Sequence, residues 1–206
     1  MNRYQLAYKR FGARAILIEW PAKIDESIQK DLHYFKQVIT KNKLKQIIEI
    51  IAAYNSLTII YNTSIENVND EILSLKQLYS QVNSTQKETS KLWHIPVCYD
   101  AEFAIDLKSF SKEKNLSVEA IITLHSKPKY LISFIGFLPG FLYLSKLDSS
   151  LEIPRKKTPN LNIKKGSVAI GGLQTGIYPI DSPGGWHVIG NSPLNFFDVR
   201  KKEPCF

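Results

Sequence analysis

The chain has 206 residues, 44% of them hydrophobic, which is enough to bury a sizeable core in one large or two small domains. Its 27 lysines and arginines outnumber its 19 aspartates and glutamates and give a formal net charge of +8 at pH 7. No nucleic-acid-binding signature accompanies this charge, so a solvated lysine-rich surface is favoured over contact with nucleic acid. The N-terminus lacks a signal-peptide pattern, and no segment approaches the roughly 18 consecutive apolar residues of a membrane helix. We therefore expect a cytoplasmic protein without a nucleic-acid or membrane partner.

The first half of the chain predicts a small α+β domain. Asp25 is a typical helix N-cap, and apolar residues recur after it at the three-to-four spacing of one helical face. These residues are Ile28, Leu32, Phe35 and Ile39. In chain order we predict strands at residues 4–8 and 13–19, the helix after Asp25, strands at residues 47–51 and 57–61, and a helix at residues 68–82. This order favours helices that cover one face of a mainly antiparallel sheet.

A polar run, NSTQKETS, follows the second helix and has almost nothing to bury. Such composition is typical of a linker between domains. We therefore predict an N-terminal domain at residues 1–84, a linker at residues 85–91 and a second domain at residues 92–206.

The second half predicts a mainly β domain with one or two helices. Nine of the ten glycines lie between Gly136 and Gly190, and short β-type runs alternate there with turns such as LPGF and SPGG. The predicted elements are a strand at residues 95–99, helices at 106–113 and 117–125, and strands at 129–135, 167–170, 177–180, 186–189 and 194–199. This pattern favours a β-barrel or sandwich.

Four sequence blocks are far more specific than the rest. They are HIPVCYDAEFAIDL at residues 94–107, FIGFLPGFLYL at 134–144, IPRKKTP at 153–159 and GSVAIGGLQTGIYPIDSPGGWHVIG at 166–190. Together, and in this order, they closely resemble the family of 5-oxoprolinase B subunits. This family is also known as the Kip-type kinase inhibitors, allophanate hydrolase subunit 1 or carboxyltransferase-domain proteins. Weaker likeness continues through the first half, so the resemblance spans essentially the whole chain.

The resemblance implies both a fold and a function. The second domain would be a cyclophilin-like, mainly β barrel, which the strand pattern accommodates. The chain would be a non-autonomous component of a hydrolase that converts 5-oxoproline to glutamate with ATP, together with separate A and C subunits. A related branch instead binds and inhibits a sensor histidine kinase. Allophanate or carboxyl transfer ranks last, because the chain has no biotin-attachment Met-Lys pair.

Six residues are predicted to line a substrate site at the rim of the second domain: Phe137, Arg155, Gln174, Thr175, Ser182 and Trp186. Glycines flank Gln174 and Thr175 and would leave both side chains accessible, although a hairpin turn with satisfied side chains is the alternative. Arg155 could hold a carboxylate or phosphate through two parallel hydrogen bonds, or simply lie on the surface. Phe137 and Trp186 offer apolar surface beside glycine-rich loops, or belong to the core.

His125 is a possible general base near the end of a predicted helix, and the favoured alternative is an interaction with the last helix carbonyls. Ser182 has Asp181 and His187 nearby, but no G-x-S-x-G turn is present, so a serine hydrolase is rejected.

Other catalytic devices are absent from the sequence. The segment GSVAIGGLQTG lacks the Gly-Lys-Ser/Thr ending of a P-loop, so we expect ATP to be shared with or held by a partner subunit. Cys98 and Cys205 are far apart and lack metal-site spacing, so no metal is expected.

The chain departs from the family pattern at three places. Asn160 stands where relatives usually have a second arginine, and Asp100 and Ala101 replace glycines. Relatives also continue beyond the final KKEPCF into a strand with a Gly-Asp turn. We therefore expect the barrel to lack its last strand here and the native protein to exceed 23.5 kDa, which an intact mass would test.

Overall fold

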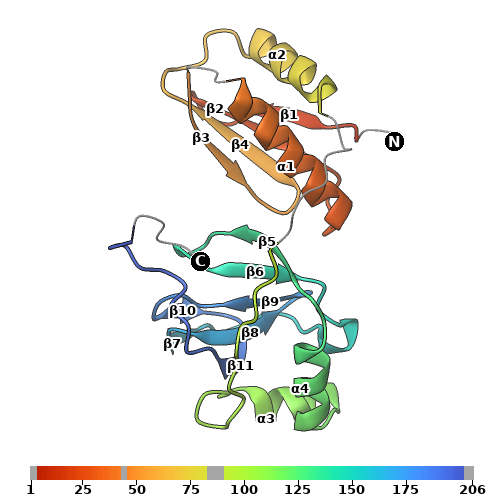
Figure 1. Ribbon diagram of the computed structural model, residues 1–206, viewed down its shortest axis with the longest axis vertical. Helices are drawn as coiled ribbons and strands as arrows, with labels where there is room; N and C mark the ends of the chain where they lie inside the picture. The colour runs from red at the N-terminus through yellow and green to blue at the C-terminus, as the bar shows by residue number, and fades with distance from the viewer. Residues whose placement is uncertain (1–3, 43–45, 83–90, 202–206) are drawn as a thin grey trace. The chain divides into compact units, whose positions relative to one another are not determined.

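The computed structural model describes residues 4–42, 46–82 and 91–201, and the chain divides into two compact units, Met1–Ser90 and Lys91–Phe206 (Figure 1). The predicted linker at residues 85–91 lies outside the described residues except for Lys91, so its bounds stay a prediction. The predicted missing last strand also lies outside them.

The N-terminal unit is a four-stranded antiparallel sheet whose strand order is β1-β2-β4-β3. Its elements are β1 (Ala7–Arg10), β2 (Ala15–Glu19), α1 (Glu26–Lys41), β3 (Ile47–Ala52), β4 (Ser56–Tyr61) and α2 (Val68–Ser80). Alternate residues of the two central strands, β2 and β4, are buried together with one face of α1 and of α2. Both helices therefore pack on the same face of the sheet, and the predicted element order of this half is confirmed (Figure 1).

The α1 helix begins where the sequence predicts it. The Asp25 carboxylate accepts a hydrogen bond from the Ser27 backbone N–H at 2.8 Å, which caps the first turn. The four predicted core residues of this helix are at most 4% exposed. Asp31 then fixes the helix to its surroundings, because one of its oxygens accepts hydrogen bonds from the Trp20 indole at 2.8 Å and the Tyr79 hydroxyl at 2.6 Å.

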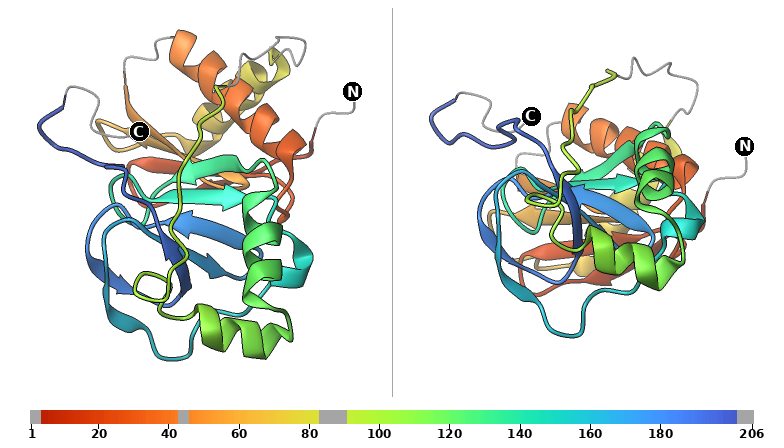
Figure 2. Two further views of the ribbon diagram at one scale, coloured as in Figure 1. Left: turned by 60° about the horizontal axis from the view of Figure 1, so that its bottom comes forward. Right: turned by 90° about the horizontal axis from the view of Figure 1, so that it is seen from below.

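The C-terminal unit has a five-stranded antiparallel sheet of order β11-β8-β9-β6-β5 and a two-stranded sheet, β10-β7. The strands are β5 (Leu131–Ile135), β6 (Leu142–Ser145), β7 (Asn160–Ile163), β8 (Ser167–Gly171), β9 (Gln174–Ile177), β10 (Ser182–Gly184) and β11 (His187–Asn191). The helices are α3 (Leu107–Lys114), α4 (Val118–Ser126) and the short 3-10 helix η1 (Ser149–Leu151). Apolar residues of α3 and α4 pack against β8 and β11, and both helices lie beside these strands in Figure 2. The described fold is thus a mixture of helices and antiparallel sheets.

The predicted helices of this unit are confirmed, whereas three predicted strands are not. The Ser117 hydroxyl caps α4 by accepting from the Ala120 N–H at 3.1 Å, as expected. Residues 95–99 contribute only one isolated bridge, from Cys98 to Asn191. The strand predicted at 177–180 instead ends at Ile177, since Pro179 cannot donate to a ladder.

The run at 194–199 forms no strand in the part of the chain that the structure describes. The sequence analysis missed three short strands, β6, β7 and β10. β6 spans only four residues, asparagines interrupt the apolar pattern of β7, and β10 consists of serine, proline and glycine.

Candidate functional site

Five aromatic side chains of the C-terminal unit form one cluster, which we call the aromatic cluster: Phe137, Phe141, Tyr143, Tyr178 and Trp186. Phe141 lies at its centre, with ring centroids of the other four 4.6–5.6 Å away. Most of these pairs meet edge to face, which is the favoured geometry of aromatic contacts. The cluster joins the turn after β5, strand β6, the segment after β9 and the residue before β11.

Two glycines make room for these rings. A Cβ atom at Gly171 would lie 2.7 Å from the Trp186 indole, and one at Gly176 would lie 2.9 Å from the Phe141 ring. Contacts this short are not tolerated between carbon atoms. The glycine-rich motif therefore seats large rings against the backbone of β8 and β9, in addition to forming turns.

The aromatic cluster has a buried base and one exposed ring. Phe141, Tyr178 and Trp186 are at most 4% exposed, whereas Phe137 is 61% exposed. Phe137 also has a backbone φ of +66°, a left-handed conformation that is strained for a bulky residue. Strain of this kind concentrates at functional sites, where the surrounding structure enforces it. An exposed aromatic ring held in this way is suited to contact a ligand or partner.

Arg155 supplies a cation at the same place. Its guanidinium carbon lies 5.6 Å from the centroid of the buried Trp186 ring, in cation–π geometry. Arg155 is exposed, and it forms no ion pair with a carboxylate among residues 4–42, 46–82 and 91–201. An unpaired guanidinium beside an aromatic surface is suited to bind a carboxylate or a phosphate.

Burial and the charge of Arg155 both affect the pKa values of Tyr178 and Tyr143. Burial raises the pKa of Tyr178 to about 12, while a hydrogen bond from the Trp186 backbone and the charge of Arg155 act in the opposite direction. Burial likewise raises the pKa of Tyr143, again opposed by Arg155. Both phenols are therefore protonated at neutral pH, and their hydroxyl groups can serve as hydrogen-bond donors.

Gln174 and Thr175 are not where the sequence pattern suggested. Both lie in strand β9 and are 6% and 0% exposed, so the prediction that flanking glycines leave them accessible is wrong. The Thr175 hydroxyl donates to the Ala169 carbonyl at 3.0 Å and accepts from His125 Nε2 at 2.9 Å. Its polar group is satisfied within the core, which is why a polar residue can occupy a buried strand position.

His125 is buried at the end of α4, with only 5% of its surface exposed. Its Nδ1 lies 2.7 Å from the Tyr99 hydroxyl, so both ring nitrogens are used inside the protein. Burial lowers its pKa to about 4, and the ring is neutral at pH 7. This geometry favours the structural role over the general-base hypothesis, although the partners are side chains of Tyr99 and Thr175 and not the helix carbonyls that we expected.

Ser182 lies in β10, opposite Ile163 of β7, and its hydroxyl donates to the neighbouring Pro183 carbonyl at 3.1 Å. No hydrogen bond joins it to the aromatic cluster among the described residues. The structure thus brings together Phe137, Arg155 and Trp186 of the six predicted site residues. Sequence reasoning left Tyr178 out of the site, although it lies within the most specific sequence block.

Comparison with known proteins agrees with this arrangement. The family described as "Carboxyltransferase domain, subdomain C and D" matches residues 6–206. Proteins named as the B subunit of 5-oxoprolinase, from Bacillus subtilis and Escherichia coli O157:H7, are 32% and 33% identical to the chain. The matches cover 98% and 94% of this chain and 88% and 87% of those proteins. The chain belongs to the family of 5-oxoprolinase B subunits.

Solved structures of other proteins have the same fold as this chain. TTHA0988 superposes with a TM-score of 0.82 at 28% identity, over 94% of this chain but only 38% of TTHA0988, so the chain spans about two fifths of that protein. PH0987 from Pyrococcus horikoshii is 37% identical over 97% of this chain and 92% of its own length, with a TM-score of 0.55. Kluyveromyces lactis urea carboxylase is 17% identical to the chain and superposes with a TM-score of 0.74. The match covers 94% of this chain and 19% of the urea carboxylase, and at this identity it shows a shared fold alone.

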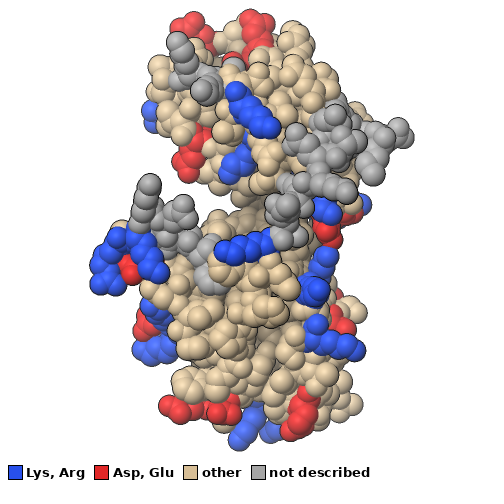
Figure 3. Space-filling view, viewed as in Figure 1, with Lys and Arg blue, Asp and Glu red and all other residues tan. Residues whose placement is uncertain are grey.

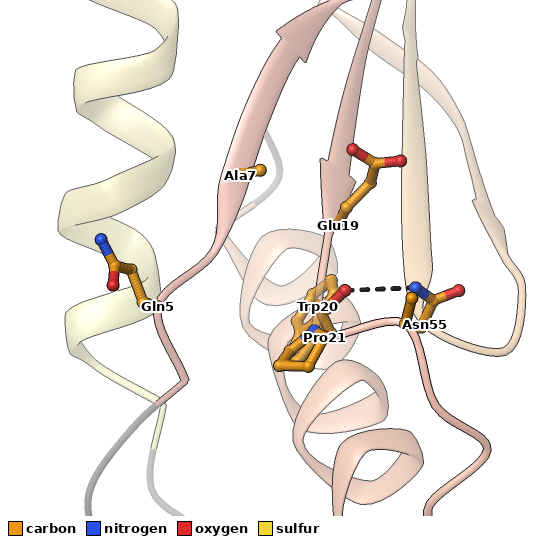
Figure 4. A pocket seen from close by; sticks show the side chains of 7 residues that line it. Gln5, Ala7, Glu19, Trp20, Pro21 and Asn55 are labelled. Carbon is orange, nitrogen blue, oxygen red and sulfur yellow. Dashed lines mark hydrogen bonds between the residues drawn. The ribbon is translucent and has the colours of Figure 1, made fainter.

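A hollow lies in the N-terminal unit, which contains none of the predicted site residues. It measures about 270 Å³ and is lined by Gln5, Ala7, Glu19, Trp20, Pro21, Ala22 and Asn55 (Figure 4). Its polar groups are largely engaged within the protein, because Glu19 pairs with Lys9 and the Asn55 amide donates to the Trp20 carbonyl at 3.1 Å. This hollow is therefore a weaker candidate than the aromatic cluster with Arg155.

Charge and metal binding add no further candidate. On the face seen in Figure 3, lysine and arginine side chains lie in separate groups with aspartate and glutamate among them. The described residues contain no group of three or more His, Cys, Asp or Glu that could hold a metal ion. Within the same ranges, every helix is too short or too polar to span a bilayer.

Proposed function

We propose that this chain is the B subunit of an ATP-dependent 5-oxoprolinase, which acts with the A and C subunits to convert 5-oxoproline to glutamate. The names and near full-length similarity of the Bacillus subtilis, Escherichia coli and Haemophilus influenzae relatives support this function, at 32–35% identity. The protein is cytoplasmic in this proposal, and its C-terminal unit is the cyclophilin-like domain of a two-domain chain.

One observation carries the proposal at the level of chemistry: the Arg155 guanidinium, which forms no ion pair among the described residues, lies over Trp186, a member of the aromatic cluster that also contains the exposed Phe137 ring. The substrate 5-oxoproline is a small ring with a neutral amide and one carboxylate. Arg155 would hold the carboxylate through two hydrogen bonds, and the aromatic cluster would contact the apolar edge of the ring. These groups bind and orient the substrate but contain no nucleophile or general base.

The residues of the site do not fit ATP. A triphosphate needs several cations or backbone N–H groups directed at it, and the glycine-rich segment around Gly171 has no P-loop lysine. Arg155 is a single cation, and the nearby Lys156 already pairs with Asp106. ATP is therefore held mainly by a partner subunit in this proposal, and this chain completes a shared site.

The test is reconstitution. ADP release and glutamate formation are measured from 5-oxoproline and ATP with this chain and its purified A and C partners, and again with this chain omitted. We expect turnover that requires this chain. If a verified complete complex shows no turnover, the proposal fails, and inhibition of a sensor histidine kinase through the exposed Phe137 surface becomes the leading alternative.

A further inference from the structure

Arg155 faces Trp186 because the neighbours of the two residues are joined by one side chain–backbone and one backbone–backbone hydrogen bond. The Pro154 carbonyl accepts from His187 Nε2 at 3.0 Å, and the Lys156 N–H donates to the Gly185 carbonyl at 2.7 Å. Residues 154–156 and 185–187 thus run side by side, with Arg155 and Trp186 opposite each other.

Asp106, at the start of α3, joins both of these segments. Its Oδ2 atom accepts from Lys156 Nζ at 2.6 Å and from the Val188 N–H at 2.7 Å, and its own N–H donates to the Val188 carbonyl at 2.9 Å. One carboxylate therefore ties the residue after Arg155 to the second residue after Trp186.

The Asp106–Lys156 ion pair is unlike the others in its burial. Its side chains are 16% and 21% exposed, whereas the basic partner in every other ion pair of the described residues is at least 54% exposed. Breaking a mostly buried pair leaves an uncompensated charge, which must find solvent or another partner. Such a pair holds a loop in place far better than an exposed one, whose contribution is small.

We infer that Asp106 is a positioning residue that fixes Arg155 over Trp186 for substrate binding. This inference rests on the proposed function for its catalytic consequence. Asp106 neutralises Lys156, so of these two adjacent cations Arg155 is the one left to meet a carboxylate beside the Trp186 ring. Without Asp106, Lys156 is released, and Arg155 loses its fixed place over the ring.

The position of Arg155 can be followed without any enzyme assay. In protein labelled with ¹⁵N-arginine, the Arg155 Nε–Hε signal is identified by its loss in Arg155→Lys, and we expect the Trp186 ring current to displace it from the free-arginine position. We expect Asp106→Asn to move it toward that position while the other arginine signals stay. Asp181→Asn is the matched control, because Asp181 also accepts from a lysine and a backbone N–H but is 59% exposed. An unchanged Arg155 signal in a folded Asp106→Asn protein overturns the inference.

A second variant guards against a folding defect. Lys156→Met leaves both hydrogen bonds between Asp106 and Val188 in place and removes only the ion pair. It is expected to move the same signal in the same direction, and Lys156→Arg is expected to restore most of it. If Lys156→Met leaves the signal unmoved, the ion pair does not position Arg155.

Steady-state kinetics of the reconstituted complex test the consequence for the reaction. We expect Asp106→Asn to raise KM for 5-oxoproline on the order of tenfold with a smaller change in kcat, since misplaced binding groups weaken substrate binding. In an Arg155→Ala background the same substitution should add less than about twofold, because it acts through Arg155. Fully additive effects contradict the positioning role. If the NMR signal moves but the complete complex has no activity, the positioning role stands and the proposed function fails.

Discussion

His125 Nε2 and Thr175 Oγ1, 50 residues apart in the sequence, lie 2.9 Å from each other in the core of the C-terminal unit. Because the Thr175 hydroxyl donates to the Ala169 carbonyl, it accepts from His125, and His125 Nδ1 in turn accepts from the Tyr99 hydroxyl. The network requires a neutral imidazole with its proton on Nε2. It joins α4, the segment before α3 and two neighbouring strands of the sheet.

This network predicts a loss of stability in mild acid. The folded-state pKa of His125 is about 4, below the usual 6.5, so the unfolded chain binds the proton more tightly. The stabilisation is therefore complete above about pH 6.5 and is lost as the pH falls toward 4. We expect the free energy of unfolding in urea to be about 2 kcal/mol lower at pH 5 than at pH 7 from this group.

The control for the acid effect is a histidine on the surface. His33→Gln, on the exposed side of α1, should keep the pH dependence, whereas His125→Gln should be less stable at pH 7 but lose most of the difference between pH 5 and pH 7. An undiminished difference in His125→Gln would show that another group titrates.

Gly171→Ala should disturb the aromatic cluster directly. The added methyl would lie 2.7 Å from the Trp186 indole, and we expect a loss of about 1–3 kcal/mol of stability from overpacking. Gly185→Ala is the matched control, because the nearest atom to its Cβ is 3.6 Å away. Urea unfolding of the two variants checks the prediction, and equal stabilities would contradict the packing described for Trp186.

Substitutions of Phe137 and Phe141 should have different effects, the first on turnover and the second on stability. Phe137 is 61% exposed, so Phe137→Ala should leave the free energy of unfolding within about 1 kcal/mol while reducing turnover of the reconstituted complex. Phe141 is 1% exposed, and Phe141→Ala should cost about 3–5 kcal/mol of stability. Unchanged turnover in Phe137→Ala would remove the exposed ring from the site.

Local sequence patterns were sufficient for the N-terminal unit and insufficient for the site. The helical face of Ile28, Leu32 and Phe35 needs only a repeated spacing and an N-cap, and both are properties of neighbouring residues. Thr175 looked like part of a polar turn, because its partners His125 and Ala169 meet it only in the folded chain. Strand ends near glycine and proline were misplaced because these residues interrupt the apolar pattern or, like Pro179, cannot donate to a ladder.

Arg155 illustrates what the sequence does and does not determine. The sequence predicted Arg155 and Trp186 as members of the same site. It did not predict that the two side chains contact each other. Their pairing depends on hydrogen bonds from His187 to Pro154 and from Lys156 to Gly185, which link segments about 30 residues apart. No periodicity in the sequence reports such a contact.

The most direct measurement of the central claim compares two substrates in the complete complex of this chain with its A and C partners. One is 5-oxoproline, and the other is 2-pyrrolidinone, the same ring without the carboxylate. The variants are wild type, Arg155→Gln and Arg14→Gln, an exposed arginine of the N-terminal unit that serves as control. We expect Arg155→Gln to lower kcat/KM for 5-oxoproline on the order of tenfold to a hundredfold, with little change for 2-pyrrolidinone, because a charge-assisted pair is lost. An equal loss for both substrates, or no loss for either, would contradict the assignment of Arg155 as the carboxylate contact of a 5-oxoprolinase.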